Sequence, residues 1–471
     1  MRKAILFLTM MVLVFGLYLL VTQSPAQAQS PNQGENELNR LGKALFFDAN
    51  LSVNKTQSCA SCHSPEAGFT GPDSRVNETT VVYHGAVGER FGNRKPPSSE
   101  YAGDSPVLHF DEAAGEWVGG MFWDGRATGG KLGDPLAEQA MGPFLNPLEQ
   151  AIPNERLVCQ RVSQSPYSGV FEQIWGAGSL NFARDASGCY ERIARSIAAY
   201  ERSTDAFTSK FDLFWDTAQA AGKDVTRIKW PGGGRGGMND PYRWQAYRGY
   251  GLSDTELQGL AAFNDPNRAN CASCHSLQPG SNGYPLFTDF GYANIGLPRN
   301  PDNPFYGMPA KWNPDGAEWV DYGLGGFLQS AGFEPEIYTS ELGKFKVPSL
   351  RNVDKRPSDD FVKAYGHNGF FKSLEDIIHF YAWRGMMQNG CMEPGMGGGG
   401  MGGGGMGGGG MGGGGMGGGG MGEGMTCEEM QSLFPIPEVD QNLAPMQHFS
   451  MMDQANILAF LKTLTDGYFE R

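Results

Sequence analysis

The sequence predicts a mainly α-helical chain organised in two halves, and two observations carry this prediction. The pentapeptide C-A-S-C-H occurs at 59–63 and again at 271–275. Leucine, isoleucine and phenylalanine recur at helical spacing at 38–46, before the first copy, and at 457–464, near the end of the chain. We therefore expect each half to form its own helical core around its own copy of the motif.

The repeated motif has the residue types and the spacing that covalent haem attachment requires. In C-x-x-C-H, two thiols add to the two vinyl groups of a porphyrin, and the following histidine supplies an axial iron ligand. A zinc half-site or a redox dithiol is the alternative for one copy. Two complete copies favour two c-type haems. The predicted attachment residues are Cys59, Cys62, His63, Cys271, Cys274 and His275.

The N-terminus and the composition predict an exported protein. Arg2 and Lys3 precede an apolar run at 4–21, and a small-x-small site follows at 26–28, which is typical of a cleaved signal peptide. An uncleaved anchor is the alternative. The formal net charge of −14 argues against a nucleic-acid partner. We expect a periplasmic location, which suits haem attachment and permits disulfides.

The chain of 471 residues is long enough for two domains. A stretch rich in Gly, Arg and Trp is expected to link them. The expected divisions are a signal peptide at 1–28, a first domain at 36–221, a linker at 222–250 and a second domain at 251–471.

Helical periodicity and capping signals predict the main helices of both halves. Ser253 is a good N-cap, and Glu256 three residues later completes a capping box. The other helices follow from apolar spacing alone. The expected helices cover 37–47, 156–175, 189–207, 254–263 and 453–465.

Four cysteines lie outside the haem motifs. We predict the disulfides Cys159–Cys189 and Cys391–Cys427, one in each half. Repeats of Met followed by four glycines fill 396–422, inside an insertion at 392–426 that is expected to be disordered. Thioethers suit Cu(I), so copper capture is the alternative to a plain flexible insertion.

Further blocks accompany the two motifs in a fixed order. They are LGKALFFD at 41–48, FWDGRA at 122–127, EQA at 138–140, GPFLNPLE at 142–149, GKFKVPSLRN at 343–352, HNG at 367–369 and LED at 374–376. With these blocks the chain resembles the bacterial di-haem cytochrome c peroxidase and MauG superfamily. The resemblance implies two class I cytochrome c-like domains with long loops and one c-type haem each, the haems facing a shared interface.

The resemblance assigns roles at the first haem, which is the peroxidatic one in this family. Glu149 and Gln139, with Pro143 between them, match the distal residues. A carboxylate there moves a proton from one peroxide oxygen to the other. Trp123 matches the tryptophan between the haems, where an aromatic ring relays an electron. Extra residues between Trp123 and Gln139 depart from the family pattern.

The resemblance also raises the question of the remaining iron ligands. His84 lies near the loop histidine that caps the first iron in some members, and a surface histidine is the alternative. Tyr381 matches the second ligand of the other haem, where peroxidases have methionine and MauG-type enzymes have tyrosine. A phenolate lowers the haem potential and methionine raises it. The other candidates for this ligand are Met386, Met387 and His379.

Calcium is usual between the domains of this family, bound in part by an asparagine. Lys95 occupies that position here, and an ammonium beside Ca²⁺ is unfavourable unless it replaces the ion. We therefore expect no family-type calcium site, unless Asn93 shifts into place.

The leading functional hypothesis is a peroxidase that reduces H2O2 at the first haem with electrons relayed from the second. A small cytochrome c or a cupredoxin would supply them. The first alternative is a MauG-like enzyme that oxidises Trp or Tyr of a partner protein. The second alternative is a non-enzymatic di-haem electron carrier or a copper-handling protein. A homodimer is left open.

Overall fold

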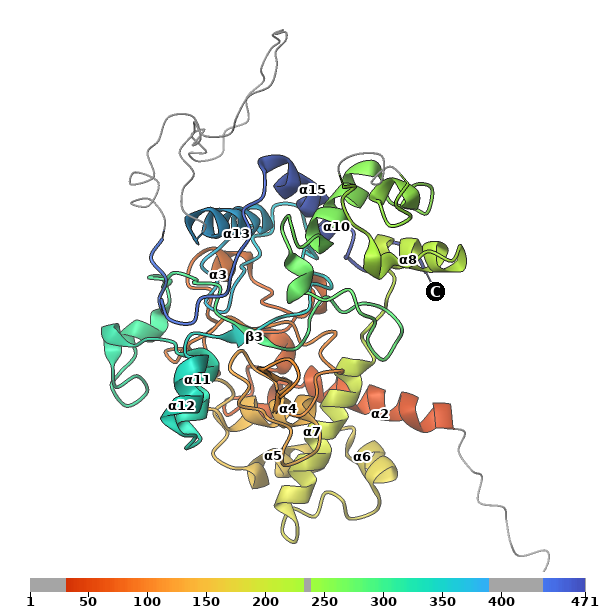
Figure 1. Ribbon diagram of the computed structural model, residues 1–471. Coiled ribbons are helices and arrows are strands. Elements are labelled where there is room, and N and C mark those ends of the chain that lie inside the picture. Colours follow the sequence, from red (N-terminus) through yellow and green to blue (C-terminus); the bar gives the residue numbers. More distant parts are fainter. Residues whose placement is uncertain (1–30, 233–238, 389–434, 471) are drawn as a thin grey trace, which may run out of the picture.

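The computed structural model describes residues 31–232, 239–388 and 435–470, and this part of the chain is mainly helical (Figure 1). The expected signal peptide, the Met–Gly repeat and the Cys391–Cys427 disulfide lie outside the described residues. The helices are α2 (Pro31–Phe46), α3 (Ser74–Glu78), α4 (Pro135–Leu145), α5 (Glu155–Ser163), α6 (Ser168–Trp175), α7 (Ala186–Arg202), α8 (Lys210–Ala220), α10 (Asp254–Asn264), α11 (Gly323–Ser330), α12 (Pro335–Tyr338), α13 (Leu374–Gln388) and α15 (Met451–Lys462).

Strands are few and short within the described ranges. β1 (His109–Asp111) pairs antiparallel with β2 (Glu116–Val118), and β3 (Tyr292–Ala293) pairs antiparallel with β4 (Phe345–Lys346). Long loops join the helices, as the sequence predicted. In the described segments, every helix is too short or too polar to cross a membrane.

Each C-A-S-C-H motif is accompanied by a pair of crossing helices. In the first pair, α2 crosses α7 at Gly42, where an added Cβ would lie 1.9 Å from the carbonyl oxygen of Ser196. In the second pair, α10 crosses α15 at Gly259, where an added Cβ would lie 1.9 Å from the carbonyl oxygen of Asn456. Only glycine permits such close approach of two backbones. The same helix contact therefore occurs in both halves.

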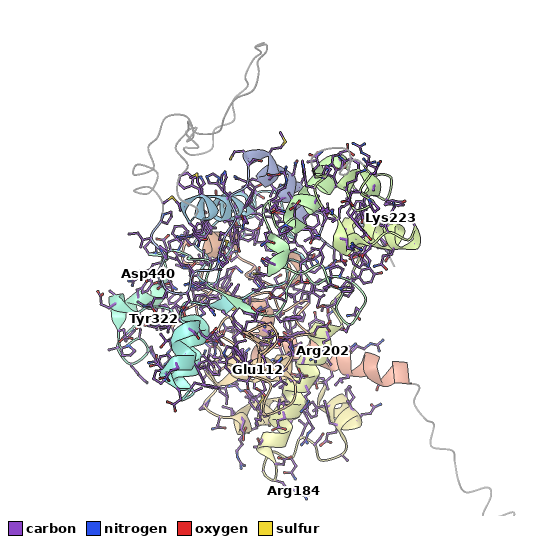
Figure 2. All side chains as sticks on the ribbon, viewed as in Figure 1. Glu112, Arg184, Arg202, Lys223, Tyr322 and Asp440 are labelled. Carbon is purple, nitrogen blue, oxygen red and sulfur yellow. A yellow bond between two sulfur atoms is a disulfide. The ribbon has the colours of Figure 1, made fainter. Side chains whose placement is uncertain are left out.

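Two large hydrophobic clusters surround these helix pairs. The first includes Leu41 and Ile193 and packs against Cys59 of the first motif. The second includes Leu257 and Phe460 and packs against Cys271 of the second motif. Figure 2 shows Arg184 at the lower tip of the molecule and Lys223 at its upper right, beside α8.

The structure differs from the expected boundary between the halves. Helix α8 falls within the expected first domain, but its Phe211 and Phe214 belong to the second cluster. Trp244 and Tyr247 lie in the expected linker, yet they are buried in the same cluster. Aromatic side chains remove much apolar area from water when buried, so these segments pack against the second half and do not form a plain linker.

Helix boundaries follow local chemistry. Ser253 and Glu256 form the predicted capping box at the start of α10, since each side chain bonds the backbone N–H of the other. The helix expected over 156–175 is split into α5 and α6, with Pro166 in the break, because proline cannot continue a helical hydrogen-bond ladder. The Cys159–Cys189 disulfide joins α5 to α7, which confirms that pairing.

Candidate functional site: two haem cavities with a shared wall

Both motifs place their histidine in the same way. The Nδ1 atom of His63 lies 3.1 Å from the carbonyl oxygen of Phe69, and that of His275 lies 2.9 Å from the carbonyl oxygen of Phe287. Both phenylalanines adopt a left-handed backbone with φ of 54°. This conformation is uncommon for a bulky residue, and it occurs at the same functional contact in both halves.

These contacts prepare both imidazoles to bind iron. A carbonyl oxygen only accepts hydrogen bonds, so Nδ1 carries the proton and Nε2 keeps its lone pair. Burial lowers the pKa of His63 and of His275, which favours the neutral ring that coordinates metals. The thiols of both motifs are free of disulfides. The motifs therefore fit the covalent haems that the sequence predicted.

The first cavity encloses about 150 Å³ beside the first motif. It brings together residues from 57–63, the loop at 82–97, the turn that holds Trp123, helix α4 and the turn that follows α4. Every residue assigned to catalysis from the sequence lines this cavity. They are Trp123, Gln139, Pro143 and Glu149.

Helix α4 positions two of these residues. Asp134 caps its N-terminus by accepting hydrogen bonds from two backbone N–H groups of the first turn. Phe144 is buried against the first cluster and holds one face of the helix inward. Gln139 and Pro143 are four residues apart and so share a face. Pro143 has no N–H to donate to the carbonyl of Gln139, so this helix turn is locally weakened beside the cavity.

Glu149 reaches the cavity from the turn after α4. Its backbone is fixed on both sides, since its N–H donates to the Asn146 carbonyl at 3.0 Å and its carbonyl accepts from Ala86 at 2.7 Å. Burial raises the pKa of the Glu149 carboxyl, while Arg126 and Asn146 favour the charged form. A carboxyl with a raised pKa in a cavity has the property that a proton-transfer group needs.

His84 does not reach the first cavity. Its side chain is exposed, and its Nδ1 lies 2.8 Å from the carbonyl oxygen of Gly85. The neighbouring Tyr83 lines the cavity instead. The placement does not support His84 as a ligand of the first iron.

Glu201 is a residue of the first cavity that the sequence analysis missed. It is 3% exposed, and its Oε2 has no hydrogen-bond partner among the described residues. Burial raises its pKa to about 8. Ile197, Ala198 and Tyr200 are also buried on α7. A glutamate on the apolar face of an amphipathic helix is the sequence signal that could have identified it.

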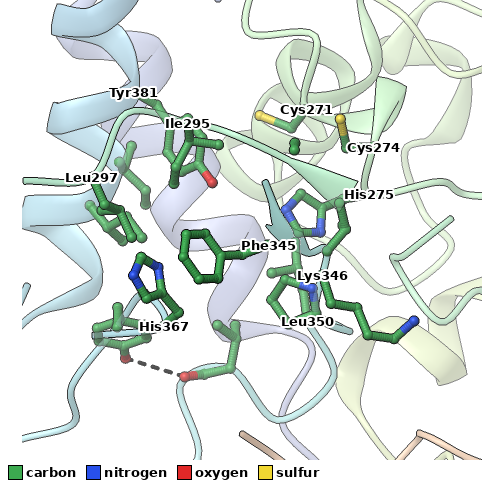
Figure 3. A pocket seen from close by; sticks show the side chains of 18 of the residues that line it. Cys271, Cys274, His275, Ile295, Leu297, Phe345, Lys346, Leu350, His367 and Tyr381 are labelled. Carbon is green, nitrogen blue, oxygen red and sulfur yellow. Dashed lines mark hydrogen bonds between the residues drawn. The ribbon is translucent and has the colours of Figure 1, made fainter. Parts of the chain in front are cut away.

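The second cavity is larger, at about 250 Å³, and lies beside the second motif (Figure 3). One face of α13 forms part of its wall. Leu374, Ile377, Ile378 and Tyr381 all line the cavity, and their spacing is that of neighbours on one helix face. Figure 3 shows the Tyr381 hydroxyl pointing into the space beside His275.

Tyr381 is the best placed of the ligand candidates on α13. Burial raises the pKa of its phenol, so an ionised phenolate there requires a cation such as iron beside it. His379 faces away and its Nδ1 contacts the amide oxygen of Gln454. Neither Met386 nor Met387 is part of the lining within the described chain, whereas Met446, from the loop before α15, is.

Two lysines, Lys363 buried and Lys346 half-buried, also suit a haem in the second cavity. Lys346 and Lys363 line it, and neither takes part in an ion pair among the described residues. Lys363 instead donates to three backbone carbonyls. Burial lowers the pKa of both ammonium groups to about 7. The carboxylates of a haem would supply the negative charge that these lysines lack.

A shared wall separates the two cavities, and Trp123 stands in it. Lys95, Pro97 and Trp123 line both cavities. The Trp123 indole N–H donates to the carbonyl oxygen of Lys95 at 2.8 Å. The ring of His367 lies edge-on to Trp123 at 6.5 Å and stacks on Phe345 at 3.4 Å between centroids. Trp123 is thus the aromatic group that spans from one cavity to the other.

The structure places Lys95 inside this wall rather than at the surface. It is 7% exposed, and its backbone N–H donates to the carbonyl oxygen of His367 at 2.9 Å. In the described ranges there is no cluster of three or more His, Cys, Asp or Glu side chains placed to hold a metal ion. The absence of a family-type calcium site stays a prediction.

Comparisons with known proteins agree with this arrangement. Residues 36–220 match the family model described as di-haem cytochrome c peroxidase. The chain is 34% identical over 356 residues to the methylamine utilization protein MauG of Paracoccus denitrificans, covering 75% of this chain and 76% of MauG. It is 25% identical over 356 residues to cytochrome c551 peroxidase of Nitrosomonas europaea, covering 75% of each chain.

A solved structure shows the same fold. The diheme peroxidase BthA from Burkholderia thailandensis aligns with a TM-score of 0.63 and 25% identity, covering 93% of this chain and 87% of BthA.

The helix pairs and the two motif-lined cavities define a mainly helical, cytochrome c-like haem protein with two haem sites. The chain belongs to the di-haem cytochrome c peroxidase and MauG family, which makes it an oxidoreductase of the peroxide-using class.

Proposed function

We propose that the protein reduces H2O2 in the first cavity with electrons that pass through Trp123 from the second. The observation that carries this proposal is the shared wall, since Trp123 lines both cavities while Glu149 and Gln139 line only the first. A haem bound by His63 would supply the iron that peroxide reaches, and a haem bound by His275 would supply the electrons.

The chain's own residues manage the protons of this reaction. Glu149 takes a proton from the peroxide oxygen nearer the iron and returns it to the far oxygen, which leaves as water. Gln139 lines the same cavity from α4 and orients the Glu149 carboxyl or the peroxide by hydrogen bonding. Two electrons and two protons convert one H2O2 to two waters, and Trp123 passes the electron that the second cavity contributes.

The exposed position of His84 supports a first iron that is open to peroxide at rest. No reductive step would then be needed to remove a histidine. We propose a periplasmic location and a small cytochrome c or cupredoxin as electron donor.

Tyr381 favours a second candidate function. A phenolate at the second iron lowers its potential and favours oxidation of a partner over acceptance of electrons from a carrier. In this version the electrons come from a Trp or Tyr side chain of a partner protein. The relative that is 34% identical carries the name MauG, and it supports this candidate.

Steady-state turnover separates the two candidates. The purified di-haem protein is given H2O2 together with reduced small cytochrome c. Sustained oxidation of the cytochrome supports the peroxidase proposal. Absence of turnover, while H2O2 still oxidises the protein, favours the partner-modifying candidate.

A further inference from the structure

Lys95 is a buried cation in the wall between the cavities, and it has no carboxylate partner among the described residues. Lys95 Nζ lies 6.0 Å from the centre of the Trp123 ring and donates to the carbonyl oxygen of Pro96 at 3.1 Å. None of the ion pairs formed by the described residues includes it. Its neighbour Arg94 differs, because it is paired with Asp124 and Asp321, each at 2.6 Å.

Lys95 is also held rigidly to the Trp123 indole. Its carbonyl accepts the indole N–H, and its own N–H donates to His367. These bonds fix the Lys95 backbone beside the indole, and the ammonium itself is held by its hydrogen bond to the carbonyl oxygen of Pro96. An ammonium beside a neutral indole is attracted to it. Once the indole has lost an electron, the same ammonium repels it.

From this geometry we propose that Lys95 is a positioning residue whose ammonium opposes positive charge on Trp123 and so slows electron passage between the cavities. The inference rests on the proposed relay role of Trp123. In that role the indole gives one electron toward the first cavity and takes one from the second, and H2O2 is the oxidant. At an effective dielectric constant of about 20, a unit charge at 6.0 Å lowers the equilibrium constant for loss of this electron by about a hundredfold.

If Lys95 acts in this way, the rate of electron passage between the two cavities depends on pH. Burial lowers the Lys95 pKa to about 8, so the ammonium loses its proton, and its charge, as the pH rises through this value. Other charged groups surround it, and two of them are cations: Lys363, which has no ion pair among the described residues, and Arg94, whose charge is paired with Asp124 and Asp321. The groups around Lys95 are His63, Arg94, Asp124, Asp321, Lys363 and His367.

The test uses the full-length di-haem protein in single turnovers. One equivalent of H2O2 is mixed with reduced protein at pH 6 and pH 10, and oxidation of the second haem is followed optically. In the wild type this rate should rise by up to about a hundredfold between these pH values. Lys95→Met should be fast at both pH values, and Lys95→Arg, which keeps its charge, should be slow at both.

Two results with these variants and with Trp123→Phe would contradict the account. If Lys95→Met keeps the wild-type pH profile, another group neutralises the ammonium and the inference is wrong. If Trp123→Phe oxidises its second haem at the wild-type rate, the relay role of Trp123 is wrong instead. Haem content by pyridine haemochrome and thermal unfolding of each variant show that the protein is intact. A merely structural role for Lys95 would not produce opposite effects of Met and Arg on the pH profile.

Discussion

The indole nitrogen of Trp123 donates a 2.8 Å hydrogen bond to the backbone carbonyl oxygen of Lys95 inside the wall between the two cavities. This bond is buried and holds the ring against the loop that carries Lys95. It also connects two sequence segments, at 93–97 and 122–127, that carry no metal or haem-attachment residue. The position of the ring therefore depends on the packing of the loops as much as on the haem motifs.

Replacing Glu149 with Gln should slow the reaction with H2O2 by about two to four orders of magnitude, the usual contribution of a general acid–base group. The amide keeps the shape of the side chain but cannot carry the proton. Stopped-flow mixing with H2O2 measures this step. Glu112→Gln is the matched control, because Glu112 is exposed on the turn between β1 and β2. Equal rates for both variants would remove Glu149 from the mechanism.

Replacing Tyr381 with Met should raise the reduction potential of the second haem, because a thioether stabilises the reduced iron and a phenolate the oxidised iron. Potentiometric titration of both haems measures this change. Tyr381→Phe removes the oxygen and keeps the ring, so its second haem should lose the spectrum of a phenolate ligand. An unchanged potential and spectrum in both variants would show that another residue, such as Met446, is the ligand.

Replacing Asp212 with Ala should destabilise the folded protein by about 3–5 kcal/mol, the cost of leaving one member of a buried ion pair alone. Arg351 Nη1 lies 2.6 Å from Asp212, and both side chains are fully buried. Four aromatic rings surround the guanidinium, which keeps water away from it. Urea unfolding measures the loss. Asp254→Ala breaks the exposed pair with Arg248 and should change little.

Replacing Glu201 with Gln should reduce the pH sensitivity of unfolding. Burial raises the Glu201 pKa from its ordinary 4.5 to about 8, so between these values the folded protein binds a proton that the unfolded chain releases. This stability is fully present below pH 4.5 and is lost as the pH rises to about 8. The wild-type unfolding temperature should therefore fall between pH 5 and pH 8.5 by more than that of Glu201→Gln. An equal decrease in unfolding temperature in the wild type and in Glu201→Gln would contradict the prediction.

Much of the fold could be predicted because local chemistry determines it. The apolar spacing of Leu41 and Leu45 predicted α2, and Ser253 with Glu256 predicted the start of α10. The Cys159–Cys189 pair was predicted from cysteine count and position. These features depend on residues that are close in sequence or few in number.

What could not be predicted depends on contacts between distant segments. The aromatic residues of α8 and Trp244 gave no sign of which core would bury them, so the expected linker was partly wrong. The left-handed backbone of Phe69 and Phe287, which aims a carbonyl at each histidine, has no sequence signal. His84 was placed by its distance from His63 along the chain, but one residue of offset put Tyr83 in the cavity instead.

The central claim is that Trp123 carries electrons between the two cavities, and a single-turnover experiment tests it most directly. Reduced wild-type protein and Trp123→Phe are each mixed with one equivalent of H2O2, and the two haems are resolved by rapid-freeze EPR. Trp117→Phe, on β2, is the control. The account predicts that both haems oxidise together in the wild type and the control, whereas the second haem of Trp123→Phe lags behind the first. Simultaneous oxidation of both haems in Trp123→Phe would contradict it.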